Sequence, residues 1–163
     1  FDPNLPRDLT YCGPYRLEDQ LPDSNMLVGD AILSPTRSYA PVIYRALAEL
    51  GGEIKGLIHC SGGAQTKCLK FGNQVHFVKD NLFPTPPLFA AIQQASGTGW
   101  QEMYKVFNMG HRMEIYVSPA RVNEVIDIAR SFGIDAQQIG YTAYADSNHL
   151  TLTDPLGNQH AYP

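Results

Sequence analysis

The sequence predicts a mixed α/β domain in which a sheet of four or five strands is layered with helices. Segments with the alternating apolar pattern of strands are separated by helical patterns of about 10 to 15 residues, an arrangement typical of layered α/β folds. The clearest transition lies in residues 100–117, where apolar residues first recur with a helical period and then alternate. With 163 residues, the chain is the size of one domain and can bury a core.

The first 25 residues, 1–25, are rich in proline and show no clear period, so we expect an irregular segment or a severed connection from a preceding domain. The α/β domain is expected over residues 26–163. Because the chain opens with Phe1 and has neither an initiator methionine nor a charged-then-apolar leader, we expect it to be a piece of a longer protein.

Helices are predicted where apolar residues keep helical spacing and where proline or glycine marks an end. Proline in a first turn loses no hydrogen bond, and glycine can end a helix in the left-handed conformation. The predicted helices begin near Ser38, at Pro86 with Thr85 as N-cap, at Trp100, and at Ser118-Pro119.

Strands are predicted over residues 55–59, 74–79 and 112–117 from short apolar or alternating runs. Two further candidates, 138–143 and 149–153, are separated by turn-forming residues. The simplest pairing of these two is a hairpin near the end of the chain, which would make the sheet mixed in direction.

Composition and charge exclude some classes of protein. The formal net charge is −4 and the basic residues are scattered, so nucleic-acid binding is not expected. No apolar run approaches the ~20 residues that span a bilayer, so we expect a soluble protein that does not act in a membrane. Three cysteines, an odd number, fit a reducing compartment, and we expect the cytoplasm.

Asn108-Met109-Gly110 joins the helix that begins at Trp100 to the strand 112–117. Gly110 can take the left-handed conformation of a helix end, which leaves Asn108 with a free side-chain amide. Asn and Gly often end helices for backbone reasons alone, so the pattern fits an ordinary helix end as well as a residue that faces a cleft.

Thr36 and Arg37 come just before the helix expected near Ser38. The free backbone amides of a helix N-terminus, together with a guanidinium, suit a phosphate or carboxylate group. The alternative for Arg37 is an ion pair with a surface carboxylate.

The strand 55–59 runs directly into Ser61-Gly62-Gly63 through Cys60. A glycine pair lets backbone approach a ligand or a neighbouring domain closely, although the same pair also makes a tight turn. The segment lacks the Gly-Lys-Ser/Thr ending of a Walker loop. His59, Cys60 and Cys68 are not at a usual zinc spacing, so no metal site is predicted.

Three segments resemble motifs of the aminoimidazole ribonucleotide synthase (phosphoribosylformylglycinamidine cyclo-ligase) family, in the family's order. They are Leu33-Ser34-Pro35-Thr36-Arg37-Ser38-Tyr39, similar to L-x-P-T-R-x-Y; His59-Cys60-Ser61-Gly62-Gly63, similar to H-x-T-G-G-G; and residues 102–110, similar to E-M-Y-x-x-F-N-M-G. The resemblance covers most of residues 29–140. It departs at Ser61, where the family has threonine, at Ala64, where the family has a third glycine, and over residues 65–70, where the family has a stretch ending in N-x-P-R. These departures indicate a divergent branch with the same fold.

The resemblance implies the C-terminal domain of this family, with a partly ferredoxin-like sheet. It implies ATP-dependent ring closure of formylglycinamidine ribonucleotide to aminoimidazole ribonucleotide, in purine biosynthesis. ATP and Mg²⁺ would be held mainly by the protein's own N-terminal domain, and the whole protein would form a homodimer. His59 and Asn108 would be catalytic, with His59 as donor or proton carrier. The residues that would bind the ribonucleotide substrate are Thr36, Arg37, Ser61, Gly62, Gly63 and Gly110.

Other interpretations remain open. Selenophosphate synthetase, thiamine-monophosphate kinase and a hydrogenase-maturation dehydratase share the domain plan. A non-catalytic binding or assembly module with the same fold is a further alternative, suggested by the altered residues 64–70. For the enzyme interpretation, we expect the loops around Arg37, His59 and Asn108 to converge at one edge of the sheet.

Overall fold

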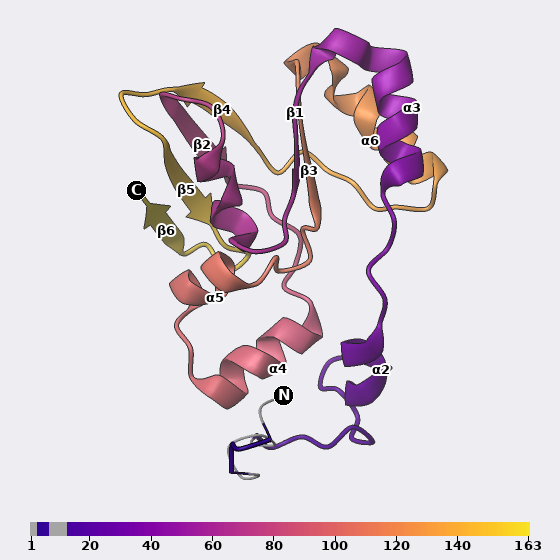
Figure 1. Cartoon of the computed structure of the whole chain (residues 1–163), viewed down its shortest axis with the longest axis vertical. Coiled ribbons are helices and arrows are strands. Elements are labelled where there is room, and N and C mark those ends of the chain that lie inside the picture. Colours follow the sequence, from indigo (N-terminus) through magenta and orange to yellow (C-terminus); the bar gives the residue numbers. More distant parts are fainter. Residues whose placement is uncertain (1–2, 7–12) are drawn as a thin grey trace.

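The protein is a mixed α/β fold with two sheets, which confirms the predicted fold class (Figure 1). The computed structural model describes residues 3–6 and 13–163. The helices are α2 (Val28–Leu33), α3 (Ala40–Leu50), α4 (Pro87–Ser96), α5 (Trp100–Val106) and α6 (Val122–Ser131), with 3-10 helices η1 (Gly51–Glu53), η2 (Ala64–Lys70) and η3 (Pro119–Arg121). The strands are β1 (Ile54–His59), β2 (Val75–Lys79), β3 (Met113–Val117), β4 (Gly140–Tyr144), β5 (His149–Thr153) and β6 (Gln159–Tyr162).

The four-stranded sheet has the order β4-β2-β5-β6 and is mixed in direction. Strand β2 is antiparallel to β4 and parallel to β5, and β5 is antiparallel to β6. The predicted hairpin between residues 138–143 and 149–153 is therefore wrong, because β2 lies between those two strands. Phe77 on β2 is the register partner of Leu150 on β5, so this insertion buries both side chains on one face.

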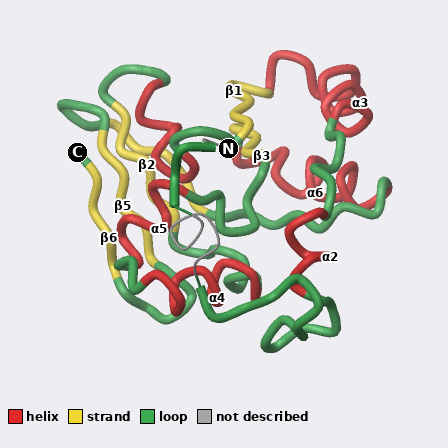
Figure 2. Tube along the Cα trace, turned by 60° about the horizontal axis from the view of Figure 1, so that its bottom comes forward, coloured by secondary structure: helices red, strands yellow, loops and turns green. Residues whose placement is uncertain are grey.

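Strands β1 and β3 form a separate antiparallel pair, called the ribbon below. Figures 1 and 2 show the ribbon between the four-stranded sheet and the helices α3 and α6. Ile115 and Val117 of β3 pack on the cluster built by α3 and α6, which includes Ala46 and Ile128. Because side chains of a strand alternate between faces, Glu114 and Tyr116 point to the other side, toward the four-stranded sheet.

The helices begin close to the predicted positions. Pro41 lies in the first turn of α3, as predicted. Helix α4 begins at Pro87 with Pro86 as its N-cap, one residue later than predicted. Ser118-Pro119 opens a 3-10 turn, and α6 proper begins at Val122. Neither α2 nor η2 was predicted, because each is too short for a helical period to be visible in the sequence.

The segment before α2 is only partly described, since residues 1–2 and 7–12 lie outside the described ranges. Within the described part, Gln20 and Leu27 form an isolated antiparallel bridge. The side chain of Leu21 is buried against Val28 of α2 and Ala91 of α4. These contacts attach residues 20–28 to the rest of the domain through a small apolar cluster.

The main core lies between the four-stranded sheet, the ribbon and helix α5. The predicted apolar stripe of α5 is confirmed: Met103 and Tyr104 are fully buried, and Trp100 and Phe107 pack against the same cluster. Leu150 and Leu152 of β5 contribute the opposite side of this core with no exposed surface. The junction between α5 and β3 is thereby fixed next to the sheet.

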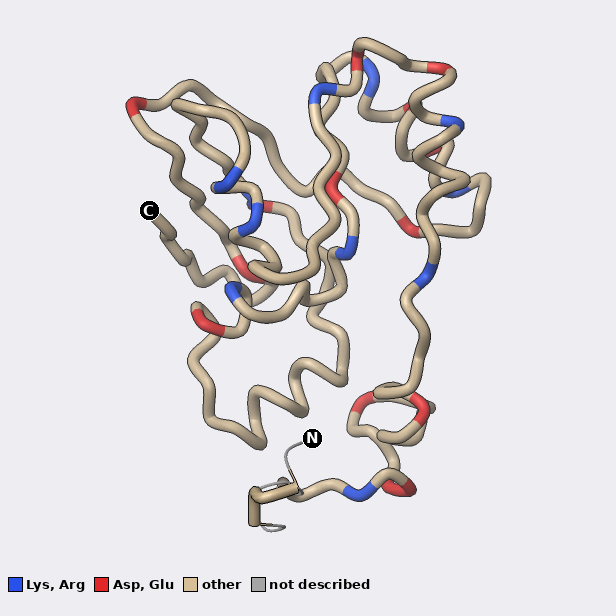
Figure 3. The backbone as a smooth tube through the Cα atoms, viewed as in Figure 1, with Lys and Arg blue, Asp and Glu red and all other residues tan. Residues whose placement is uncertain are grey.

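Charged residues of both signs are dispersed along the chain (Figure 3). Several form ion pairs within one helix, such as Arg45 with Glu49 on α3 and Lys105 with Glu102 on α5. No helix within the described ranges has the length and apolar character needed to cross a membrane.

Replacing Leu150 by alanine is expected to lower the free energy of unfolding by about 2–5 kcal/mol, because the side chain is fully buried and its removal leaves a cavity. Leu156→Ala is the matched control, since Leu156 is 75% exposed and its loss should cost less than about 0.5 kcal/mol. Urea denaturation measures both. Equal costs for the two variants would contradict the assignment of the core.

Candidate functional site

The loops that follow β1 and precede β3 meet at one end of the ribbon. The Cys60 N–H donates to the Arg112 carbonyl over 2.8 Å and extends the ladder beyond His59 and Met113. The Gln65 side-chain N–H donates to the Asn108 carbonyl over 2.7 Å. Two of the three loops predicted to converge are therefore in direct contact.

Asn108, Met109 and Gly110, called the Asn108 turn below, form a tight connection from α5 to β3. The Asn108 Oδ1 accepts the Gly110 N–H over 2.9 Å. Gly110 has φ +91°, the left-handed conformation predicted for it, and Met109 has φ +52°. The side chain of Met109 is 1% exposed, so its burial offsets the cost of the unusual backbone. Within the described ranges, the Asn108 amide nitrogen has no hydrogen-bond partner.

His111 follows the Asn108 turn and is buried. Its Nε2 accepts the Phe83 N–H over 2.9 Å, and its Nδ1 lies 3.2 Å from the Met109 carbonyl. Because Nε2 must accept, the proton lies on Nδ1 and the ring is neutral. Burial, reinforced by the charge of Lys79, lowers the pKa of His111 to about 4. His111 is thus a structural histidine that holds the Asn108 turn against residue 83.

A buried ion pair connects the four-stranded sheet to the ribbon. The Lys79 Nζ on β2 lies 2.5 Å from the Glu114 Oε1 on β3, and both side chains are 4% exposed. The Lys79 ammonium also donates to the Gln65 carbonyl and to the Gln65 Oε1. All three ammonium donors are therefore used, which a buried charge requires.

Glu114 accepts two further hydrogen bonds. The Tyr116 hydroxyl donates to Oε2 over 2.7 Å, and the Cys60 thiol donates to Oε1 over 3.2 Å. Burial and the Glu114 charge raise the pKa of Cys60 and of Tyr116 far above their usual values. Burial also raises the pKa of Cys68 to about 11. Neither Cys60 nor Cys68 is therefore a thiolate nucleophile at neutral pH.

Lys79, Glu114, Gln65, Cys60 and Tyr116 are called the buried network below. Sequence reasoning did not single out Lys79, Glu114 or Gln65. A signal for Lys79 was present, because Val75, Phe77 and Lys79 share one face of β2 and a lysine on an apolar face needs a partner. The partner could not be identified without the fold.

Ser61-Gly62-Gly63, called the glycine loop below, leaves the ribbon beside the Asn108 turn. The Ala64 N–H donates to the Ser61 carbonyl over 2.8 Å and closes a tight turn. Gly63 has φ +88°, so the turn itself requires glycine at this position. Gly62 has open space where a Cβ would lie. The tight-turn interpretation is therefore confirmed at Gly63. Close approach of a ligand at Gly62 stays a prediction, for which the space is open.

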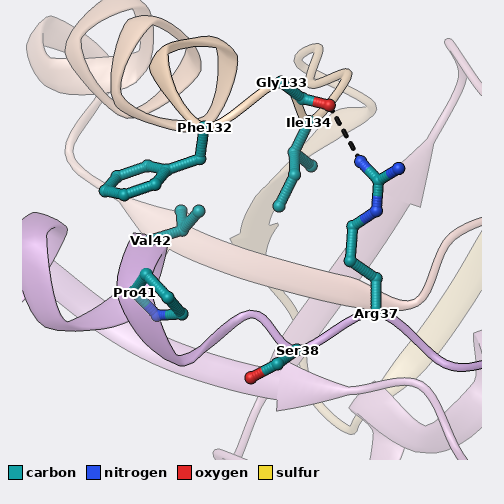
Figure 4. Close-up of a pocket in the computed structure, with 7 residues that line it drawn as sticks. All are labelled: Arg37, Ser38, Pro41, Val42, Phe132, Gly133 and Ile134. Atoms are coloured by element: carbon teal, nitrogen blue, oxygen red, sulfur yellow. Dashed lines mark hydrogen bonds between the residues drawn. The ribbon is translucent and has the colours of Figure 1, made fainter.

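Arg37 lies elsewhere, between α3 and the end of α6 (Figure 4). Its Nη1 donates to the Gly133 carbonyl over 2.8 Å instead of forming the ion pair considered from the sequence. Arg37 lines a cavity of about 310 Å³; the other lining residues are Ser38, Pro41, Val42, Phe132, Gly133 and Ile134. None of these belongs to the glycine loop or the Asn108 turn. Thr36, next to Arg37, is exposed.

A larger cleft of about 610 Å³ lies between β3, α6, the end of β2 and the start of β4. His111, Glu114 and Tyr116 are among its lining residues, so one side of the cleft borders the buried network. Of the predicted site residues, Gly110 lines it and His59, Ser61 and Asn108 do not. The cleft and the edge formed by the two loops therefore meet at Gly110, and the other predicted site residues of the edge lie outside the cleft.

The described residues show no group of three or more His, Cys, Asp or Glu side chains placed to hold a metal ion.

The fold resembles that of a solved structure. A crystal structure of E. coli HypE, a hydrogenase maturation protein, matches with a TM-score of 0.51 at 14% identity, over 84% of this chain and 45% of that chain. At this identity the match shows the fold alone.

Residues 16–152 match the family described as "AIR synthase related protein, C-terminal domain". The chain belongs to this family. It is 34% identical over 113 residues to a phosphoribosylformylglycinamidine cyclo-ligase of Methanocaldococcus jannaschii, covering 69% of this chain and 32% of the relative. It is 36% identical over 111 residues to the protein of the same name from Methanothermobacter thermautotrophicus, covering 68% of this chain and 32% of the relative. The chain thus spans about a third of the length of these curated relatives.

Removing one partner of the buried ion pair by Lys79→Met is expected to lower the free energy of unfolding by about 3–5 kcal/mol, because Glu114 is left charged and buried. The double variant with Glu114→Gln should recover part of the loss. The matched control is Arg45→Met, whose pair with Glu49 is about half exposed and worth less than about 1 kcal/mol. Chemical denaturation of the variants tests this, and a cost for Lys79→Met no larger than that of the control would refute it.

Stability is expected to fall as pH drops from 7 to 5. The pKa of His111 is about 4 in the fold and about 6.5 unfolded, so in this window the unfolded state binds more protons. The sign is therefore loss of stability on acidification, of about 2 kcal/mol at pH 5 from this group. His111→Gln should remove most of this dependence, whereas His149→Gln should not. Urea denaturation at both pH values measures it, and an identical pH slope in His111→Gln would exclude the mechanism.

Proposed function

We propose that this chain is the C-terminal domain of an ATP-dependent cyclo-ligase that converts formylglycinamidine ribonucleotide to aminoimidazole ribonucleotide in purine biosynthesis. Family membership and the cyclo-ligase relatives support this proposal. The observation that supports it is the pair of hydrogen bonds on either side of the glycine loop, from the Cys60 N–H to the Arg112 carbonyl and from the Gln65 side chain to the Asn108 carbonyl. These two bonds bring most of the proposed site residues to one edge. The domain would provide the substrate side of a site shared with a second domain.

The proposed catalytic residues are His59 and Asn108. His59 ends β1 and is exposed, and its side chain has no hydrogen-bond partner within the described ranges. It is therefore available as a donor or proton carrier. The unpartnered amide nitrogen of Asn108 would donate a hydrogen bond to a substrate oxygen or ring nitrogen. Ser61, Gly62, Gly63 and Gly110 would bind the substrate mainly through their backbone, since three of the four have no side chain.

Thr36 and Arg37 would bind a phosphate group of the ribonucleotide. Arg37 uses one donor on Gly133, and a guanidinium has five, so several remain for phosphate oxygens. Because Arg37 contacts Gly133, just after α6, and not the two loops, it would bind a part of the substrate remote from the reacting centre. Remote binding of this kind positions the reacting end.

Ring closure requires the formyl oxygen to become a good leaving group and the amidine nitrogen to approach its carbon. Phosphorylation of that oxygen by ATP would supply the first requirement. The residues of this chain would supply the second, by orienting the ribonucleotide and by moving a proton at His59. We propose that ATP and Mg²⁺ bind mainly to an N-terminal domain of the same protein, since this chain spans about a third of its relatives.

The domain organisation follows from the same proposal. Residues 26–163 would form the C-terminal domain, and residues 1–25 would be an irregular segment or the connection to the domain before it. The whole protein would act as a cytoplasmic homodimer.

The second candidate function is a non-catalytic assembly module with the same fold. It is favoured by residues 64–70, which depart from the family pattern and are largely given to packing: Ala64, Gln65 and Cys68 are buried. Loss of the family sequence there would remove a ligand contact and leave a stable domain. The two candidates differ in whether the whole protein turns over the ribonucleotide.

In the whole protein, His59→Ala and Asn108→Ala are each expected to lower kcat/KM for ring closure by about 10²-fold or more. The matched controls are His149→Ala and Asn123→Ala, which lie outside the site and should leave kcat/KM unchanged. The assay measures aminoimidazole ribonucleotide formed from substrate, ATP and Mg²⁺. The isolated 163 residues should show no turnover. Near-native kinetics in both site variants would favour the assembly-module function.

A further inference from the structure

Lys67 on η2 holds the glycine loop in place. Its ammonium donates to the His59 carbonyl over 2.9 Å and to the Ser61 hydroxyl over 2.7 Å. An ammonium has three N–H donors, so one remains. Lys67 lies in residues 65–70, where the sequence departs from the family motif, and it brings a cation to the loop.

The charge of Lys67 is not neutralised by a carboxylate. No ion pair within residues 3–6 and 13–163 includes it, in contrast to the buried Lys79 and the exposed Lys105. Its two acceptors are a carbonyl and a hydroxyl, which are neutral. A half-buried cation that contacts only neutral oxygens attracts an anion more strongly than one that is already paired.

The backbone of the glycine loop adds further donors beside Lys67. The amides of Ala64 and Thr66 donate to Ser61 and Gly63, but the amides of Gly62 and Gly63 have no acceptor in the part of the chain that is described. The space beside Gly62 is open to a ligand. Consecutive backbone amides next to a cation form a concave set of donors suited to an anion.

We propose that Lys67, with the amides of Gly62 and Gly63, binds a phosphate group at the edge that carries His59. This inference rests on the proposed function, in which two phosphate groups must be held: that of the ribonucleotide and that transferred from ATP. The two cations lie in different places, Arg37 between α3 and α6 and Lys67 beside His59. Because His59 is the proposed proton carrier, Lys67 serves the phosphate at the reacting end.

The test is a titration of the 163-residue chain with orthophosphate, followed by amide NMR shifts. The wild type should show saturable shifts at the amides of Gly62 and Gly63. Lys67→Met should weaken binding by about tenfold or more, because a charge-assisted bond is lost. Lys70→Met is the matched control, on the same 3-10 helix, and should bind like the wild type. Lys67→Arg keeps the charge and should bind within about threefold of the wild type.

Absence of shifts at Gly62 and Gly63, equal weakening in Lys70→Met, or a loss in Lys67→Arg as large as in Lys67→Met would overturn the proposal. A parallel titration with ribose 5-phosphate identifies the source: a loss in Lys67→Met confined to orthophosphate supports the transferred group, and a loss for both probes supports a sugar phosphate at this loop. Phosphate binding is measured without ring closure, so failure of the proposed enzyme activity gives a different result, which is binding without turnover.

Discussion

The ion pair between Lys79 and Glu114 is the interaction on which the arrangement of the two sheets depends. Burying either charge alone would cost several kcal/mol, so the pair is tolerated only because each group is fully hydrogen-bonded. Lys79 has three acceptors, and Glu114 accepts from Lys79, Cys60 and Tyr116. These requirements can be met only when β2 and β3 hold one relative position. The pair therefore specifies how the ribbon sits on the four-stranded sheet.

The same network positions the candidate site. Gln65 is fully buried, and its backbone carbonyl and its Oε1 both accept from the Lys79 ammonium. Its side-chain N–H donates to the Asn108 carbonyl. The position of the Asn108 turn is thus coupled through one side chain to the ion pair. On one side of the glycine loop, the Cys60 thiol donates to Glu114; on the other side, the Lys67 ammonium donates to the His59 carbonyl. Both loops are held by the interior of the domain, so their exposed groups are presented at fixed positions.

The elements that the sequence predicted well are those whose period is visible within a few residues. The stripe of α5 and the strand β3 needed no knowledge of distant segments, and both are present. The alternation did not predict that Glu114, on the polar face of β3, is buried. The hairpin prediction failed because proximity along the chain favoured pairing residues 138–143 with 149–153. The observed arrangement instead inserts β2 between these strands, so that Phe77 is buried beside its register partner Leu150. These two residues are 73 positions apart in the sequence, and no local pattern indicates that they pair.

The site could be predicted only in part, for a similar reason. His59, the glycine loop and the Asn108 turn were identified from local turn chemistry and from motif resemblance. Gln65 and Lys67 stood within a stretch noted only for departing from the family. Their importance comes from bonds to residues far along the chain or to the backbone of a folded loop, such as the 43-residue separation between Gln65 and Asn108. A sequence pattern does not contain such bonds.

The distribution of unused hydrogen-bonding groups indicates what the edge can bind. No buried side-chain nitrogen or oxygen within the described ranges lacks a partner, so the interior has no polar capacity left over. At the edge the situation is reversed, because the Asn108 amide nitrogen, the Gly62 and Gly63 amides and one Lys67 proton are all unused. Each of these groups is a donor. A surface that gathers donors and one unpaired cation is complementary to an oxygen-rich anion such as a phosphate group.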